Sequence, residues 1–169
     1  ELLTTFTTAY SPYDIYMKAL FELFKDQLDV PMLESPESAA IELTEFQEDG
    51  YRNAKRIVEL YGGVLIADSV GLGKTFLGLR FLDDYAYKLR QKALVVCPAQ
   101  LRDSLWRPIL EKYRIFTVMR SQEEVSQSDF PYAEFGDCDW VLVDESHNFR
   151  NTSANRYDNL MRVLTSGKP

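Results

Sequence analysis

The stretch VLIADSVGLGKT at positions 64–75 decides how this chain folds, because it joins an apolar run to a glycine-rich loop. Residues 64–67 fit a buried strand, and apolar side chains recur at helical spacing over residues 76–85. Gly71 and Gly73 let backbone N–H groups turn inward on an anion, and the N-terminus of the following helix adds positive potential. The stretch therefore predicts a strand, a phosphate-binding loop and a helix in succession.

Lys74 and Thr75 complete this loop. A lysine here reaches the outer phosphates of a nucleoside triphosphate, and a threonine hydroxyl here holds Mg²⁺. The strict pattern G-x-x-x-x-G-K-[ST] has a glycine at the position that Asp68 occupies, so the match is partial. A glycine-rich turn before an ordinary helix therefore remains an alternative.

A second motif follows the apolar run WVLV at positions 140–143. Asp144 and Glu145 come directly after this predicted strand, at the end where open α/β sheets place their ligands. In phosphate-loop enzymes an Asp at this point holds Mg²⁺, and an adjacent Glu can polarise the attacking water. Alone, an Asp-Glu pair is more often a solvated turn, but a strand before it and a phosphate loop upstream make the pair much more specific.

These motifs resemble, in order and spacing, those of SWI/SNF-like superfamily II DNA helicases and translocases. DESH at 144–147 is similar to the DEAH box, and ADSVGLGKT at 67–75 is similar to motif I, where an Asp commonly stands at the position of Asp68. ALVVCPA at 93–99, with Leu101 and Trp106, resembles motif Ia, and LTEFQ at 43–47 resembles the adenine-reading Q motif. The resemblance runs from about Leu43 to Leu164.

Bacterial members that carry a DESHNFRN stretch, found here at 144–151, are the most similar. Some of those are fused to phospholipase D-like nuclease domains, which this sequence lacks. The resemblance implies an α/β fold: a RecA-like three-layer sandwich around a parallel sheet. It also implies ATP and Mg²⁺ as cofactors and DNA, in duplex form, as the partner.

The predicted site residues have different origins. Phosphate chemistry supports Lys74 and Thr75, and the need for a Mg²⁺ ligand opposite the loop supports Asp144. Glu145 is the predicted general base. The other predicted nucleotide contacts, which rest on the loop or on the resemblance, are Gln47, Val70, Gly71, Leu72, Gly73, Phe76 and His147.

Some of these roles have a simpler alternative. The resemblance makes Gln47 an adenine reader, but it also fits a solvent-facing helical glutamine. His147 would link bound ATP to a second lobe, or would be an ordinary polar loop residue. For Trp106, core packing beside Leu105 and Ile109 is favoured over stacking on a base. Arg150 and Asn151 follow the carboxylates and are a guess for a DNA path.

The resemblance also limits what this chain can do alone. With 169 residues and 46% hydrophobic content it can form one well-cored lobe, whereas the motor needs two lobes with ATP between them. The sequence stops before the motif III strand, which in this family lies between the loop strand and the DESH strand, and before the second lobe's arginine finger. We therefore expect a piece of a longer protein, a gap in the sheet and very slow hydrolysis by this piece alone.

Charge is unevenly distributed. The net charge is −7, with −9 on residues 1–50 and +2 on residues 51–169. An acidic chain binds DNA weakly through phosphate neutralisation, so any DNA contact should be local and salt-sensitive. The most plausible basic patch lies near the motif Ia resemblance, although a solvated helix face explains its charges equally well. Its members are Arg102, Arg107, Lys112 and Arg114.

Cysteine content and hydropathy predict a soluble, cytoplasmic protein. Cys97 and Cys138 form no disulfide or metal-binding framework, and Cys97 ends a predicted buried strand as a small apolar residue. No apolar run approaches the length of about 18 residues that a membrane span requires.

The chain divides into two predicted parts. Residues 1–38 form an acidic helix, which starts near Ser11, and a linker over 29–38. Residues 39–169 form the ATP-binding lobe, with a helix over 44–61. Its strands are predicted at about 64–67, 93–97, 115–119 and 140–143. Pro108 should kink or end a helix near Arg107.

Two other classes of function remain. A phosphate-loop ATPase could remodel protein complexes rather than act on nucleic acid. A non-catalytic fragment could dock a partner domain through its acidic N-terminal helix.

Overall fold

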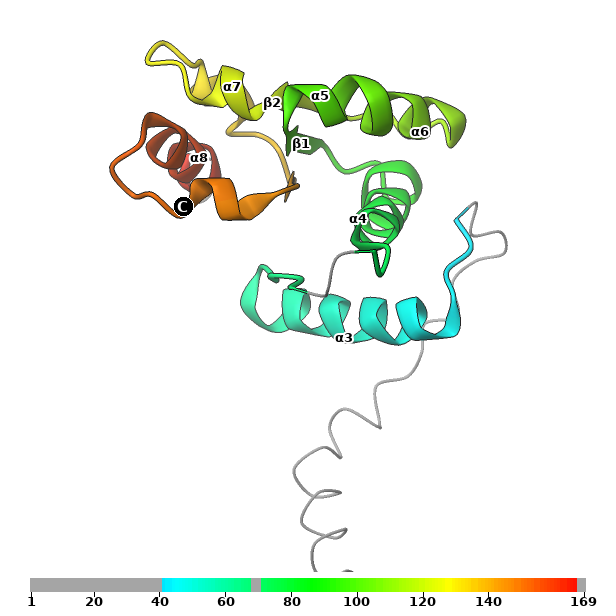
Figure 1. Cartoon of the computed structure of the whole chain (residues 1–169). Helices are drawn as coiled ribbons and strands as arrows, with labels where there is room; N and C mark the ends of the chain where they lie inside the picture. Colours follow the sequence, from blue (N-terminus) through cyan, green and yellow to red (C-terminus); the bar gives the residue numbers. More distant parts are fainter. Residues whose placement is uncertain (1–40, 68–70, 167–169) are drawn as a thin grey trace, which may run out of the picture. The chain divides into compact units, whose positions relative to one another are not determined.

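A parallel three-stranded sheet forms the centre of the computed structural model, which describes residues 41–67 and 71–166 (Figure 1). The strand order is β2-β1-β3. The central strand β1 (Ala93–Cys97) pairs with β2 (Val118–Ser121) and with β3 (Trp140–Val143). In this register Leu94 lies opposite Val118 on one side and Val141 on the other. The predicted α/β class with a parallel sheet is confirmed.

Helices of three kinds connect and flank these strands. The α-helices are α3 (Glu45–Tyr61), α4 (Lys74–Leu82), α5 (Ala99–Leu101), α6 (Arg107–Lys112), α7 (Gln122–Val125) and α8 (Asn155–Thr165). Among the described residues, η1 (Asp83–Lys88) and η2 (Arg102–Trp106) are π-helical, and η3 (Tyr132–Phe135) and η4 (Ser146–Phe149) are 3₁₀ helices.

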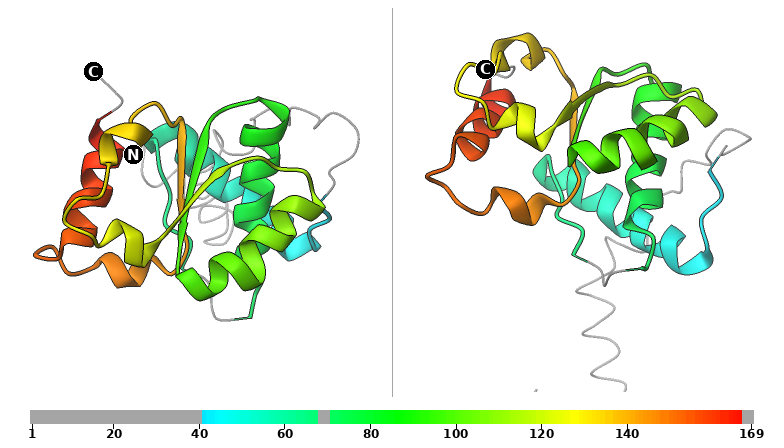
Figure 2. Two further views of the ribbon diagram at one scale, coloured as in Figure 1. Left: turned by 90° about the horizontal axis from the view of Figure 1, so that it is seen from above. Right: turned by 45° about the horizontal axis from the view of Figure 1, so that its top comes forward.

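The central strand is covered on both faces, which gives three layers. Because side chains alternate along a strand, Val95 and Cys97 join a core with α4, η1, η2 and α6. Leu94 and Val96 join a second core with α7, η3, η4 and α8. Figure 2 shows α8 and α4–α6 on opposite sides of the strands. All five residues of β1 are buried, as a strand enclosed on both faces requires.

Helix α3 begins and ends where the sequence predicts. Thr44 caps its N-terminus by accepting the backbone N–H of Gln47, and Gly62 ends it with a left-handed φ of 75°. Tyr51 and Ala54 are its buried residues, and they pack against Leu77 and Phe81 of α4. Helix α3 is thereby attached to the helix that follows the glycine loop.

The prediction of a strand over residues 64–67 is wrong. This segment runs without regular structure and pairs with no strand of the described sheet. Val64 and Ile66 pack against the α3–α4 core, whereas the side chain of Leu65 is 74% exposed. A strand needs a neighbour for its N–H and C=O groups, and none of the described residues supplies one here. Strand β3 is therefore an edge strand of the described sheet.

The strand predicted at 115–119 begins later, at Val118. Helix α6 closes through a Schellman motif, in which Ile115 N–H donates to Leu110 C=O and Arg114 N–H donates to Glu111 C=O. Arg114 therefore has a left-handed φ of 56° where a glycine is usual. The buried Ile115 belongs to the helix end rather than to the strand, which the apolar pattern did not distinguish.

Pro108 does not end its helix, because the helical segments run without a break from Ala99 to Lys112. The π-helical segment η2 ends at Trp106, and the regular helix α6 restarts at Arg107 with Pro108 in its first turn. Arg107 N–H donates to Arg102 C=O, five residues back, as in a π turn. A proline in the first turn needs no N–H partner, so α6 tolerates it.

A buried charged network joins α3 to α4 and η1. Tyr51 Oη donates to Asp84 Oδ2 at 2.5 Å, and Lys88 Nζ lies 2.6 Å from Asp84 Oδ1 and 2.8 Å from Asp83 Oδ2. Arg80 Nη1 donates to the backbone C=O of Ile41. Burial opposes ionisation of Asp84, but hydrogen bonds from Lys88 and Tyr51 outweigh it and hold the pKa of Asp84 below its ordinary value.

Two further sequence predictions have separate outcomes. Cys97 is fully buried as predicted, and burial raises the pKa of its thiol to about 12. The predicted helix from Ser11 and the linker over 29–38 lie outside the described residues, so the division at residue 38 stays a prediction.

Candidate nucleotide-binding site

The glycine loop has the backbone that an anion-binding turn needs. Gly71 and Gly73 adopt left-handed φ values of 89° and 82°, which side chains other than glycine rarely tolerate. Gly73 is the N-cap of α4, and no side chain caps the helix there. Helix α4 begins directly at this loop, and the positive potential of a helix N-terminus favours an anion. Lys74 and Thr75 lie in the first turn of α4.

Gln47 connects the first turn of α3 to this loop. Its Nε2 donates to the C=O of Leu72 at 3.1 Å, while its Oε1 accepts the backbone N–H of Thr44 at 3.1 Å. A Cβ at Gly73 would collide with the Gln47 amide, so the approach requires glycine at that position. The structure thus brings Gln47 to the glycine loop rather than leaving it on a free helix surface.

The other predicted loop residues differ in exposure, and the structure does not describe all of them. Leu72 and Phe76 are partly exposed beside the loop, and Thr75 is half-buried. Val70 and Asp68, which the sequence places in the loop, lie outside the described residues.

The carboxylates stand at the carboxyl end of β3, as predicted. Asp144 N–H donates to Val96 C=O at 2.8 Å, which continues the pairing of β3 with β1. The two oxygens of the Asp144 carboxylate each accept one hydrogen bond, Oδ2 from Trp106 Nε1 at 2.8 Å and Oδ1 from Glu145 N–H at 2.9 Å. Glu145 has a left-handed φ of 52° and starts the 3₁₀ helix η4.

Gln122 holds the backbone of this turn, a role that the sequence did not indicate. Its buried side chain donates from Nε2 to Asp144 C=O at 2.7 Å and accepts from Asn148 Nδ2 at 2.9 Å. Gln122 opens α7, whose N-cap Ser121 forms a capping box with Glu124. The capping box marks the start of α7 in the sequence. No local sequence pattern, however, shows that the Gln122 side chain reaches the turn at Asp144.

His147 and Trp106 differ in exposure. His147 Nδ1 lies 3.1 Å from Glu145 Oε2, and both side chains are largely exposed. Trp106 is 1% exposed within the core, which confirms core packing over base stacking. Its hydrogen bond to Asp144 was not foreseen.

The helix after the glycine loop contacts the strand that carries the carboxylates. A Cβ at Gly78 of α4 would lie 2.9 Å from Leu142 Cδ1 and 3.3 Å from Trp106 Cη2. Leu142 belongs to β3, two residues before Asp144. Glycine at position 78 therefore lets α4 pack closely on β3. Because α4 starts at the glycine loop and β3 ends at the carboxylates, this contact connects the loop to the carboxylates.

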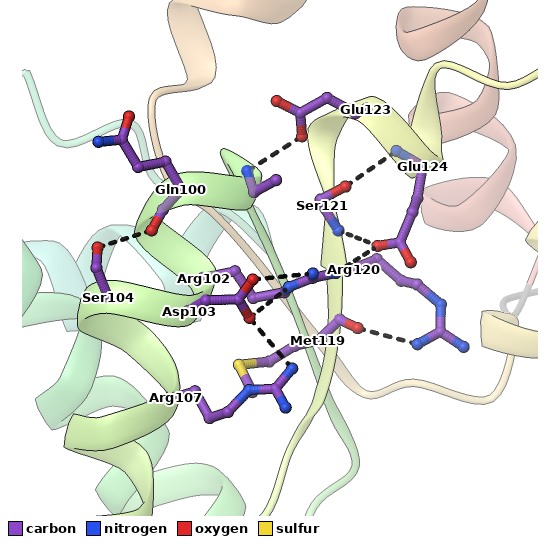
Figure 3. A network of polar contacts seen from close by, with 11 residues as sticks. Gln100, Arg102, Asp103, Ser104, Arg107, Met119, Arg120, Ser121, Glu123 and Glu124 are labelled. Carbon is purple, nitrogen blue, oxygen red and sulfur yellow. Dashed lines mark hydrogen bonds and ion pairs between the residues drawn. The ribbon is translucent and has the colours of Figure 1, made fainter.

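Two residues of the predicted basic patch, Arg102 and Arg107, form ion pairs. Figure 3 shows the polar contacts between the helix at 99–112 and the β2–α7 region. Arg102 pairs with Asp103 and Glu124, each at 3.1 Å, and Arg107 pairs with Asp103 at 3.3 Å. These arginines already have acidic partners, so the patch is less basic than its sequence indicates.

The donor set fits Mg²⁺ only together with a phosphate. Over residues 41–67 and 71–166, no group of three or more His, Cys, Asp or Glu side chains could hold a metal by itself. Mg²⁺ is commonly bound by one or two protein oxygens and by substrate phosphates. The Thr75 hydroxyl and the Asp144 carboxylate suit that arrangement. Each oxygen of the Asp144 carboxylate accepts one hydrogen bond and keeps a lone pair for a metal ion.

Comparisons with known proteins agree with the motifs. No family model matches the chain. Over 122 residues it is 28% identical to an uncharacterized ATP-dependent helicase, YqhH of Bacillus subtilis (strain 168). The match covers 62% of this chain and 22% of that helicase, so the chain spans about a fifth of its relative's length.

The fold has a relative among solved structures. The Sulfolobus solfataricus SWI2/SNF2 ATPase core in complex with dsDNA matches with a TM-score of 0.61 and 17% sequence identity. The match covers 76% of this chain and 32% of that one, and it shows a shared fold. The name of the bacterial relative agrees with the helicase resemblance of the sequence, and the solved structure shows the shared fold alone. In the part of the chain that the structure describes, no helix meets the length and apolarity needed to span a membrane.

Proposed function

We propose that this chain is the ATP-binding lobe of an ATP-dependent DNA translocase or helicase. The observation that carries the proposal is the contact of α4 with β3 at Gly78, because α4 starts at the glycine loop and β3 ends at the carboxylates. The helicase name of the bacterial relative and the fold shared with an ATPase core solved with dsDNA support it.

The residues divide the work on the nucleotide. The loop from Gly71 to Gly73 and the N-terminus of α4 bind phosphate oxygens, and Lys74 neutralises their charge. Thr75 and Asp144 would hold Mg²⁺, which supplies further charge neutralisation on the phosphates when bound. Glu145 orients and polarises the attacking water, and its left-handed turn at the end of β3 exposes its carboxylate.

The other residues recognise the nucleotide or transmit its presence. Gln47, beside the loop, reads the adenine through the amide hydrogen and lone pair that its contacts with Thr44 and Leu72 leave available. Val70, Leu72 and Phe76 complete the nucleotide contacts. His147, paired with Glu145, links the site to a second lobe.

DNA is the proposed track, bound across this lobe and a second RecA-like lobe in the cytoplasm. ATP closing between the lobes would step the protein along the duplex. Hydrolysis by this chain alone should be very slow, because an arginine finger contributes about 10³- to 10⁵-fold to kcat in related phosphoryl-transfer enzymes.

Remodelling of protein complexes is the second candidate function. The pairing of Arg102 and Arg107 with acidic side chains favours it, since those arginines are less available for phosphates.

The test is ATP hydrolysis by the longest natural polypeptide that contains this chain, measured with and without duplex DNA over a range of salt concentrations. A translocase should be stimulated by duplex DNA, and the stimulation should weaken steeply with salt. Lys74→Ala should abolish the stimulated rate, whereas Lys92→Ala, which removes an exposed partner of Asp137 at the amino end of β1, should not. Hydrolysis that depends on Lys74 but ignores DNA would favour the remodelling function.

A further inference from the structure

The indole of Trp106 is bonded to the proposed metal-binding carboxylate. Trp106 Nε1 donates to Asp144 Oδ2 at 2.8 Å across 38 positions of sequence, although the ring itself is almost completely buried. A buried indole N–H needs an acceptor, and here the acceptor is a carboxylate that faces the end of the sheet. A charged acceptor makes this bond stronger than one between neutral groups.

The surroundings of Trp106 fix the position of the indole. Trp106 ends the π-helical segment η2, in which Ser104 Oγ donates to Gln100 C=O at 2.7 Å, and Pro108 follows in the first turn of α6. A π turn adds a residue to the helix and so changes the direction of the side chains beyond it, and such turns are frequent at functional sites. The ring packs against α4, where Gly78 leaves room for it.

The start of the same helix is also tied down. The Glu123 carboxylate accepts the N–H of Ala99 at 3.1 Å, and Arg102 bonds to Glu124 of α7 at 3.1 Å (Figure 3). Hydrogen bonds from backbone N–H groups, of Glu123 itself and of Ala99, hold the pKa of Glu123 below its ordinary value. The helix that carries Trp106 is therefore anchored at its first turn as well as at its core face.

Two donors together set the plane of the Asp144 carboxylate. Oδ2 is held by Trp106 and Oδ1 by the N–H of Glu145, which leaves each oxygen with capacity for one more partner. Carboxylates that bind metals are in turn hydrogen-bonded, and removal of such a partner typically costs 10- to 100-fold in metal affinity.

We propose that Trp106 is a positioning residue that holds Asp144 in the orientation for Mg²⁺ and couples it to the helix of the phosphate loop. The proposal rests on the proposed function, because it takes Asp144 as a Mg²⁺ ligand. Trp106 contacts both sides of the site, Asp144 through its N–H and Gly78 of α4 through its ring edge. Its role is to orient another residue rather than to touch the nucleotide.

The chain offers a matched control for this test. Its two tryptophans both donate through the indole, but Trp140 Nε1 donates to Gln91 Oε1 at 2.6 Å, and its ring contacts that of Tyr85 in a tilted arrangement. Trp106→Phe and Trp140→Phe thus remove the same group, one beside Asp144 and one far from it.

The first measurement is binding of a non-hydrolysable ATP analogue to the 169-residue chain as a function of Mg²⁺ concentration. Trp106→Phe should weaken the apparent Mg²⁺ affinity by about 10-fold or more, while analogue binding without Mg²⁺ stays unchanged. Trp140→Phe should leave the Mg²⁺ dependence as in the wild type. Equal Mg²⁺ dependence in all three proteins would overturn the role of Trp106 alone. Failure of the wild-type chain to bind would overturn the proposed function and with it the metal role.

A second measurement does not require a change at Trp106, in case Trp106→Phe fails to fold. Indole ¹H–¹⁵N resonances of the ligand-free chain report the two tryptophans separately. Asp144→Ala should move the Trp106 resonance and leave that of Trp140, and Mg²⁺ with the analogue should also move only the first in the wild type. A Trp106 resonance that ignores both changes would contradict the proposal.

Discussion

The two sides of the candidate site are held in different ways. On the carboxylate side, β3 pairs with the buried strand β1, and side chains distant in sequence, Trp106 and Gln122, hold Asp144. On the glycine-loop side, residues 64–67 pair with no described strand, and Gln47 of α3 holds the loop by a hydrogen bond to Leu72. The difference teaches that the sheet organises the carboxylates, whereas helix packing organises the loop.

The largest expected effect is a difference in stability between two leucine-to-alanine variants, one in the sheet and one in the segment before the loop. Leu94→Ala removes a fully buried side chain from the central strand and should lower the free energy of unfolding by about 2–5 kcal/mol. Leu65→Ala, in the exposed segment before the loop, should change it by less than about 0.5 kcal/mol. Urea unfolding followed by circular dichroism measures both. A large loss for Leu65→Ala would show that residues 64–67 are paired and buried in solution.

A smaller effect should come from the contact that joins the two sides. Gly78→Val places branched atoms against Leu142 and Trp106, and overpacking of this kind costs about 1–3 kcal/mol of unfolding free energy. Gly50→Val, on α3, meets only Leu77 at 3.9 Å and should be close to neutral. Thermal unfolding of the two variants provides the comparison. Equal stability of both would mean that α4 does not pack on β3 as closely as described.

The smallest expected effect is the pH dependence that the buried Asp84–Lys88 network on the loop side contributes. Because the folded pKa of Asp84 lies below its unfolded value of about 3.9, its stabilising contribution is complete above that value and is lost as pH falls through the folded pKa. The stabilising contribution of Lys88 depends on pH in the alkaline range. Burial alone would lower its pKa, but hydrogen bonds to Asp83 and Asp84 raise the pKa, so its contribution is complete below an unfolded pKa of about 10.4 and is lost above it.

Unfolding free energies of the wild type and Asp84→Asn, measured from pH 3 upward, check this assignment. The variant should lose stability at neutral pH and show a flatter acid limb than the wild type. Parallel acid limbs would assign the pH dependence to other carboxylates.

Sequence patterns were sufficient where a signal is local. The capping residues Thr44 and Gly62 bound α3, and the apolar runs before Pro98 and Asp144 mark β1 and β3. They were insufficient where an element depends on a distant partner. An apolar run at 64–67 fits a strand, yet it becomes one only when a neighbour accepts its hydrogen bonds.

The same limit applies to the site. Gly71, Gly73 and Asp144 have recognisable roles because their spacing in the sequence is tied to phosphate and metal chemistry. Gln122 and the indole of Trp106 act over 22 and 38 positions, and their partners are set by how β2, η2 and β3 come together. Neither residue has a local pattern that names its partner.

The central claim is that the glycine loop and Asp144 form one site for Mg²⁺ with a nucleoside triphosphate. Calorimetric binding of Mg²⁺ with a non-hydrolysable ATP analogue to the 169-residue chain tests it most directly. We expect saturable binding by the wild type, loss of binding in Lys74→Ala and retention in Lys112→Ala. A folded wild-type chain that binds no nucleotide, or binding that Lys74→Ala leaves intact, would contradict it.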